Sequence, residues 1–128
     1  MKLLLDTCTF LWILTEADEL SATSREAFTD PENEVFLSAV SAWEITLKHS
    51  LGKLSLPDDP AAYVPRQRER HFIRALPLEE GAILHLSRLP RLHGDPFDRA
   101  LVCQAIAGGM TIATPDVDIR RYPVPTLW

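Results

Sequence analysis

The chain has 128 residues, of which 46% are hydrophobic and 24% charged. These values are typical of one globular domain, and they exclude a disordered chain, a fibrous repeat and a multidomain protein. The net charge of −5 excludes a uniformly basic nucleic-acid-binding chain, but the acids concentrate in residues 1–34, with eight acids and two bases, whereas residues 35–128 have ten acids and eleven bases. A local basic stripe in the second part therefore remains open.

The two cysteines, Cys8 and Cys103, are far apart and show no zinc-binding spacing. We therefore expect neither a disulfide scaffold nor a zinc knuckle, and a reducing cytoplasm fits this usage. The apolar stretch after Lys2 is interrupted by Asp6 and no cleavage motif follows, which argues against a signal peptide. No apolar run reaches the roughly 20 residues of a membrane helix, so no membrane partner is expected.

In the first half of the chain, apolar runs and capping signals predict two strands and three helices. The strands are expected at residues 2–5 and 34–38, and the helices at 9–16, 21–30 and 38–51. Thr23 and Glu26 have capping-box spacing in the second helix, and Gly52 can end the third helix in the left-handed conformation.

In the second half, residues 57–65 predict a loop that passes into a short arginine-bearing helix. Strands are expected at 72–76, 110–114 and 124–127, with a helix at 78–89. Asp95 and Pro96 predict the start of another helix, which ends at Gly108 and Gly109. Alternating strands and helices predict an α/β fold with one three-layer domain, a parallel sheet of about five strands flanked by helices.

Two acids follow predicted strands. Asp6 comes after the first strand and Asp116 after the strand that ends at Thr114. Ligands of parallel sheets bind beyond the carboxyl ends of the strands, so these positions are candidates for a site. Aspartate is also common in turns, and that interpretation is open for each residue taken alone.

Two further acids lie on predicted apolar helix faces. Glu44 shares a face with Val40, Leu47 and Leu51, where a carboxylate needs a partner or a metal ion unless it reaches solvent from the edge. Asp98 precedes Leu101, Val102 and Ala105 on an inward face, although Asp95 and Asp98 are also placed to cap the helix N-terminus.

Four acids that converge on one crevice need a counter-charge, and a hard divalent cation such as Mg²⁺ or Mn²⁺ is the simplest one. The histidines and cysteines show no zinc grouping. His93 is the only histidine close to the acids in sequence, and we interpret it as a hydrogen-bonding residue rather than a ligand.

Ordered motifs along the chain resemble those of the PIN-domain ribonucleases of the VapC toxin type. These motifs are LLLDTCTFLW, SAVSAWEITLKHSLGKL, HGDPFDRALVCQA, TIATPD and YPVPTLW. The resemblance spans residues 1–128 as one PIN domain. It implies a PIN-like fold, Mg²⁺- or Mn²⁺-dependent cleavage of single-stranded or loop RNA, a cognate antitoxin, and a homodimer or a higher toxin–antitoxin assembly in the cytoplasm.

Transferred to this sequence, the family's motifs imply that the metal-binding and catalytic acids are Asp6, Glu44, Asp98 and Asp116. Asp95, Thr7 and Thr114 are candidate additional site residues, and each of them could instead cap a turn or a helix. Metal held by these acids would activate a water for in-line attack on phosphorus, and no protein nucleophile is needed. The thiolate of Cys8 would be disfavoured beside Asp6.

The arginines Arg66, Arg68, Arg70 and Arg99 are candidate RNA-binding residues, and Trp12 or Phe97 could stack a base. A solvated helix face is the alternative for this cluster. The apolar run Phe10–Ile13 predicts a surface on which an antitoxin lays an amphipathic segment.

Other functions stay open at this stage, namely a non-catalytic protein-binding module of the same fold, or a metal-dependent DNA nuclease or phosphatase. A haloacid-dehalogenase phosphatase would need an aspartate where Cys8 stands, and a receiver domain would need a lysine after a late strand, but no lysine follows Lys53.

Overall fold

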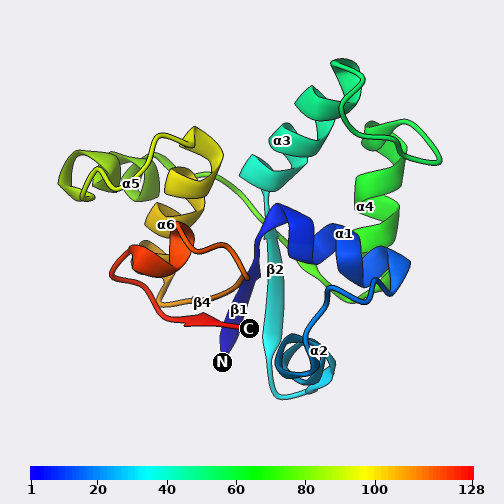
Figure 1. Ribbon diagram of the computed structural model, residues 1–128, viewed down its shortest axis with the longest axis horizontal. Helices are drawn as coiled ribbons and strands as arrows, with labels where there is room; N and C mark the ends of the chain where they lie inside the picture. Colours follow the sequence, from blue (N-terminus) through cyan, green and yellow to red (C-terminus); the bar gives the residue numbers. More distant parts are fainter.

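The computed structural model describes residues 1–128 as a parallel sheet with helices on both faces (Figure 1). The strands are β1 (Lys2–Leu5), β2 (Glu34–Ser38), β3 (Arg74–Leu76), β4 (Thr111–Ala113) and β5 (Thr126–Leu127), in the order β3-β2-β1-β4-β5. The helices are α1 (Thr7–Thr15), α2 (Ala22–Thr29), α3 (Ala39–Ser50), α4 (Pro60–Arg70), α5 (Glu80–Ile83) and α6 (Pro96–Gly108), with the 3-10 segments η1 (Leu84–Arg88) and η2 (Ile119–Arg121). The predicted three-layer α/β fold with five parallel strands is confirmed.

The central strand β1 is buried on both faces of the sheet. Leu3 and Leu5 pack with Phe10 of α1 on one face, whereas Leu4 packs with Leu101 of α6 on the other. This explains the continuous apolar run at the start of the sequence, because a parallel strand covered on both faces has no polar side. No helix of the structure is long and apolar enough to cross a membrane.

The strand order creates a switch point at the carboxyl ends of β1 and β4, and we call the region between these two strand ends the crevice. The chain builds β1, β2 and β3 outward in one direction and then returns to place β4 on the other side of β1. Connections therefore leave β1 and β4 toward opposite faces of the sheet, and such a switch point is where open α/β sheets bind their ligands.

Side-chain caps define the starts of the first two helices. α1 begins at Thr7 rather than Thr9, because the carboxylate of Asp6 accepts from the Thr9 backbone N–H at 2.8 Å. α2 begins after Ser21, whose hydroxyl accepts from the Ser24 N–H at 3.0 Å, so the range predicted for this helix, 21–30, is confirmed, and Ser21 rather than Thr23 is its cap.

The largest differences from the predicted elements occur between residues 57 and 89. Residues 60–65 are helical and not a loop, because Asp59 caps α4 and Pro60 occupies its first turn, where a missing N–H is tolerated. Phe72 has a φ of 57°, which is incompatible with a strand, and β3 is correspondingly short. The single helix predicted at 78–89 is instead the pair α5 and η1.

Candidate active site

Asp6 lies at the carboxyl end of β1, in the crevice beside β4. Its side chain is only 4% exposed. One carboxylate oxygen, Oδ1, accepts from the Thr9 N–H and from the thiol of Cys8 at 3.3 Å, and the other, Oδ2, accepts from the hydroxyl of Thr114. Asp6 therefore caps α1 and faces β4 at the same time.

Asp116 lies on the other side of the same crevice, after β4. Its backbone N–H donates to the Thr114 hydroxyl at 3.0 Å, and its Oδ1 accepts from the N–H groups of Asp118 and Ile119. Asp116 therefore does stabilise a turn, which was the alternative interpretation from the sequence, and it uses one carboxylate oxygen to do so. The hydroxyl of Thr114 connects Asp6 and Asp116.

Glu44 enters the crevice from α3, and 7% of this residue is exposed. Its Oε1 accepts from the Thr7 hydroxyl at 2.6 Å, and its Oε2 pairs with the ammonium group of Lys48 one turn later in the helix. Lys48 is therefore the charged partner that a buried glutamate requires.

The buried face of α3 differs from the predicted one. Leu47 and Leu51 are exposed, with Leu51 at 58%, so these leucines do not share the inward face. The inward face is polar toward α1, where the Thr7 hydroxyl hydrogen-bonds to Ser41 and Glu44. The buried residues of the helix are Val40, Ser41, Glu44 and Ile45.

Asp98 lies in the first turn of α6, and the predicted inward residues Leu101, Val102 and Ala105 are buried. Its Oδ2 lies 3.2 Å from Nε2 of His93. The expected hydrogen-bonding role of His93 is confirmed by this contact.

Asp95 is the N-cap of α6. Its Oδ1 accepts from the N–H groups of Phe97 at 2.9 Å and Asp98 at 3.1 Å. The capping interpretation of Asp95 is therefore confirmed, and its second carboxylate oxygen remains available at the crevice.

The carboxylates influence one another across the crevice. Burial raises the pKa of Asp98 to about 6, the hydrogen bond from His93 acts in the opposite direction, and Asp95, Asp116 and Glu44 raise it further. The hydrogen bond to Glu44 raises the pKa of Lys48, with a further contribution from Asp95 and Asp98. Side chains from α3, α6 and the segment after β4 therefore share one electrostatic environment.

Cys8 is unsuited to act as a nucleophile. Burial raises the pKa of its thiol to about 12, and the neighbouring carboxylate of Asp6 contributes to this shift. The thiol is protonated at neutral pH, as the sequence indicated.

Trp43 is a site residue that the sequence analysis did not single out. Its ring packs edge-to-face on Phe97, with the ring centroids 4.7 Å apart, and 57% of Trp43 is exposed. The pair joins α3 to α6 beside Glu44 and Asp98. The sequence held a signal for this exposed ring, because Trp43 directly precedes Glu44 and this helix position points away from the core. Trp12 instead packs on Trp128 at the end of the chain.

The predicted RNA-binding arginines fall into two groups. Arg66 pairs with Asp58, Arg68 donates to the Ile73 carbonyl, and Arg70 lines a hollow beside Val35 at the start of β2. Arg68 and Arg70 therefore lie near the amino ends of β3 and β2, opposite the acids. Of the predicted set only Arg99, on α6, lies next to an acid of the crevice.

The oxygen atoms of the four carboxylates are chemically suited to bind a hard divalent cation. Carboxylate oxygens are the ligands that Mg²⁺ and Mn²⁺ prefer. Burial raises the pKa of Asp98, its negative neighbours raise it further, and a bound cation would favour the charged form. In this arrangement no three His, Cys, Asp or Glu side chains are close enough together to hold a metal ion. Protein hydrogen bonds from Thr114, Lys48 and His93 engage the carboxylates instead.

Comparison with known proteins identifies the family. Residues 3–125 match the model of the PIN domain. The chain is 36% identical over 111 residues to Ribonuclease VapC16 of Mycobacterium tuberculosis, covering 87% of this chain and 74% of that protein.

Solved structures with the same fold cover nearly the whole chain at 14–20% identity. They include VapBC2 from Rickettsia felis bound to a promoter DNA fragment, with a TM-score of 0.75, 14% identity and coverage of 99% of this chain and 98% of that one. DNA-bound VapBC from Salmonella typhimurium has a TM-score of 0.70, 16% identity and coverage of 99% and 97%. FitAcB from Neisseria gonorrhoeae has a TM-score of 0.64, 20% identity and coverage of 98% and 96%.

Proposed function

This chain belongs to the PIN domain family, and we propose that it is the endoribonuclease toxin of a type II toxin–antitoxin pair. The observation that carries the proposal is the group of acids at the switch point of the sheet, contributed by Asp6, Glu44, Asp98 and Asp116. The relative that is 36% identical to this chain over 111 residues is named a ribonuclease, which supports RNA as the substrate. Residues 1–128 form one PIN domain in this proposal.

The metal-dependent part of the proposal assigns these four acids as the residues that would hold Mg²⁺ or Mn²⁺, with Asp95 as an additional candidate. When bound, such an ion supplies Lewis-acid polarisation of the phosphoryl group and an activated water. The protein contributes the orientation of the acids. Thr114 fixes Asp6, Thr7 fixes Glu44, and His93 fixes Asp98.

The exposed Trp43, supported by the half-buried Phe97, binds the substrate beside these acids. Trp43 and Phe97 offer a ring surface at the rim of the crevice, and an unpaired base of single-stranded RNA can stack on it. Because stacking accepts any base, this contact orients the strand without selecting its sequence.

The antitoxin partner fits an apolar groove between α1, the segment before α4, and α4 itself. The groove has a volume of about 530 Å³, and Leu11, Trp12, Leu14, Leu54, Leu56 and Tyr63 are among its lining residues. The predicted surface Phe10–Ile13 needs a correction, because Phe10 and Ile13 are buried in the core and only Leu11 and Trp12 reach the groove. An amphipathic antitoxin segment would bury its apolar face here.

The antitoxin complexes among the structural relatives support a toxin–antitoxin assembly, in which the toxin is a homodimer or part of a higher oligomer. Two free cysteines, Cys8 and Cys103, are consistent with a cytoplasmic location in this proposal.

The decisive experiment compares substrates and metals with one purified protein. The antitoxin-free chain is incubated with single-stranded RNA and with DNA of the same sequence, in Mg²⁺, in Mn²⁺ and in EDTA, with Asp98→Asn as the control. We expect cleavage of the RNA only, loss of cleavage in EDTA, and no cleavage by the variant. Cleavage of DNA would favour a DNA nuclease, and cleavage that persists in EDTA would contradict the metal-dependent mechanism.

A further inference from the structure

A basic hollow lies between η1 and the first turn of α6, close to the acids. Its volume is about 220 Å³, and its lining residues are Leu86, Arg91, His93, Gly94, Pro96 and Arg99. We propose that this hollow binds a phosphate group of the RNA strand that flanks the cleaved bond. The inference rests on the proposed function and names a subsite for its substrate.

One imidazole ring separates the hollow from the catalytic acids. His93 lines the hollow, and its Nε2 contacts Asp98 at 3.2 Å while its Nδ1 lies 2.7 Å from the Tyr122 hydroxyl. Both ring nitrogens are thus engaged by the protein, so the ring forms a wall and the arginines supply the donors. A phosphate in the hollow would belong to a nucleotide next to the one whose bond is cleaved.

The two arginines of the hollow have no carboxylate partner in the protein. Arg91 and Arg99 form no ion pair. By contrast, four arginines pair with carboxylates, namely Arg66, Arg68, Arg74 and Arg121. In a chain with a net charge of −5, two guanidinium groups facing one hollow without a protein anion are available for an external one. The guanidinium fork matches the geometry of a phosphate group.

The protein holds Arg99 in place before any ligand binds. Its Nη1 donates to the Pro90 carbonyl at 2.9 Å and to the Tyr122 hydroxyl at 3.0 Å, and its Cζ lies 5.9 Å from the centroid of the Tyr122 ring. These bonds use one nitrogen and leave Nε and Nη2 for a ligand. A side chain ordered in advance loses little conformational entropy when it binds.

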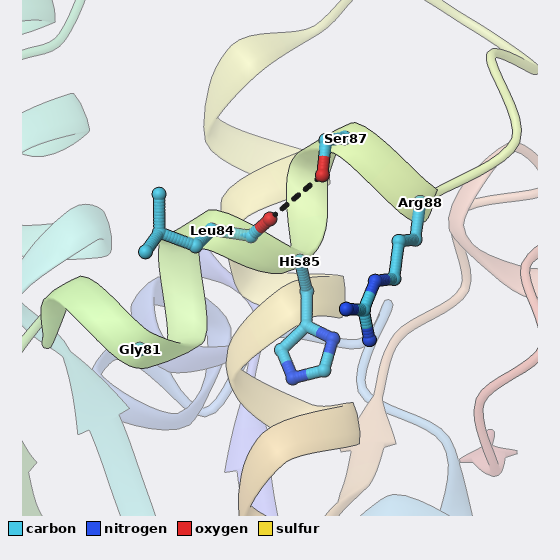
Figure 2. A pocket seen from close by; sticks show the side chains of 5 residues that line it. All are labelled: Gly81, Leu84, His85, Ser87 and Arg88. Atoms are coloured by element: carbon cyan, nitrogen blue, oxygen red, sulfur yellow. Dashed lines mark hydrogen bonds between the residues drawn. The ribbon is translucent and has the colours of Figure 1, made fainter.

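The positive charge of the hollow reduces the electrostatic repulsion between RNA and the nearby carboxylates. An RNA strand that approaches four carboxylates is repelled, and a fixed positive charge beside them offsets this repulsion locally. A second hollow of about 290 Å³ lies along η1, where His85 and Arg88 point to the same side of the segment, and Arg88 adds a further positive charge there (Figure 2).

The test uses Arg91→Gln, because the Arg91 side chain makes no ion pair or hydrogen bond within the protein and its loss should not affect folding. The matched control is Arg25→Gln, which removes the same charge from an exposed, unpaired arginine of α2. Binding of a fluorescent single-stranded RNA is measured by anisotropy in EDTA over a range of salt concentrations. Cleavage kinetics in Mn²⁺ are measured in parallel.

We expect Arg91→Gln to weaken RNA binding about three- to tenfold, to reduce the slope of log affinity against log salt by about 0.7, and to raise KM with little change in kcat. Arg25→Gln should match the parent. If the parent cleaves RNA, two results would overturn the subsite alone. One is an equal loss of RNA affinity in Arg91→Gln and Arg25→Gln, and the other is unchanged RNA affinity in Arg91→Gln. Weaker binding of the antitoxin with unchanged RNA binding would assign the hollow to a protein partner and also overturn it. A parent that neither binds nor cleaves RNA would overturn the proposed function as well.

Discussion

The hydroxyl of Thr114 donates to Oδ2 of Asp6 across the boundary between β4 and β1, although the two residues are 108 positions apart. Both side chains are buried. The same hydroxyl accepts from the Asp116 N–H at 3.0 Å, and the Asp6 N–H donates to the Ala113 carbonyl at 3.3 Å. Thr114 is therefore the residue through which the sheet fixes the relative positions of two site acids.

Thr114→Val should impair both activity and stability, because a valine of similar shape leaves the buried carboxylate of Asp6 without its hydroxyl donor. We expect a stability loss of about 1–3 kcal/mol in chemical denaturation and an activity loss of about 10- to 100-fold. Thr114→Ser keeps the hydroxyl and should retain most of both properties. Parental activity and stability in Thr114→Val would show that the contact has no role.

The metal-free protein should become more stable as the pH falls from 7 to 5, because Asp98 titrates with a pKa of about 6 in the folded chain. The folded state then binds a proton more tightly than the unfolded state, so the charged carboxylate is unfavourable above pH 6 and this cost disappears toward pH 4. Asp98→Asn should remove a contribution on the order of 1–2 kcal/mol from this pH dependence. Denaturation curves in EDTA at several pH values measure it, and an identical slope in parent and variant would contradict it.

Addition of Mn²⁺ should raise the melting temperature of the parent, since an ion bound only by the folded state stabilises it by mass action, by about 2.7 kcal/mol at a concentration 100 times the Kd. Asp98→Asn and Glu44→Gln should gain less, because each replaces a charged donor by a neutral one. Thermal melts with EDTA and with Mn²⁺ make the comparison. Equal gains in all three proteins would place the ion elsewhere.

Trp43→Ala should weaken binding of single-stranded RNA by an amount equivalent to about 1–3 kcal/mol, the contribution of one stacked base. Trp43→Phe retains a ring at the position and should recover much of the affinity. The side chain is largely exposed, so the melting temperature should change little. Anisotropy titrations check the prediction, and unchanged affinity in the alanine variant would exclude stacking at this ring.

Leu11→Glu should weaken antitoxin binding at least about tenfold, because it places a charge in the apolar groove against the partner's apolar face. Leu47→Glu is the matched control, since Leu47 is exposed on α3 and does not line the groove. Co-purification and calorimetric titration with the cognate antitoxin measure the difference. Similar weakening by both substitutions would move the antitoxin to another surface.

The sequence by itself indicated where the strands lie and which acids are candidates for the site. The apolar run before Asp6 predicted a buried strand, Asp95 with Pro96 predicted the start of a helix, and both are present. The acids were recognisable because Glu44 and Asp98 occupy positions that an apolar interior disfavours. These features depend on neighbours within one element, which periodicity and capping rules describe.

Only the tertiary structure decided which side chains meet. The bonds from Thr114 to Asp6 and from His93 to Asp98 join residues of different elements, and Arg70 of α4 lies beside the start of β2, away from the acids. The same holds for the burial of Phe10 and Ile13 and for the exposure of Leu51. A periodic pattern gives the face of one helix or strand, whereas the order of strands and the packing of helices between them set the distances across the site.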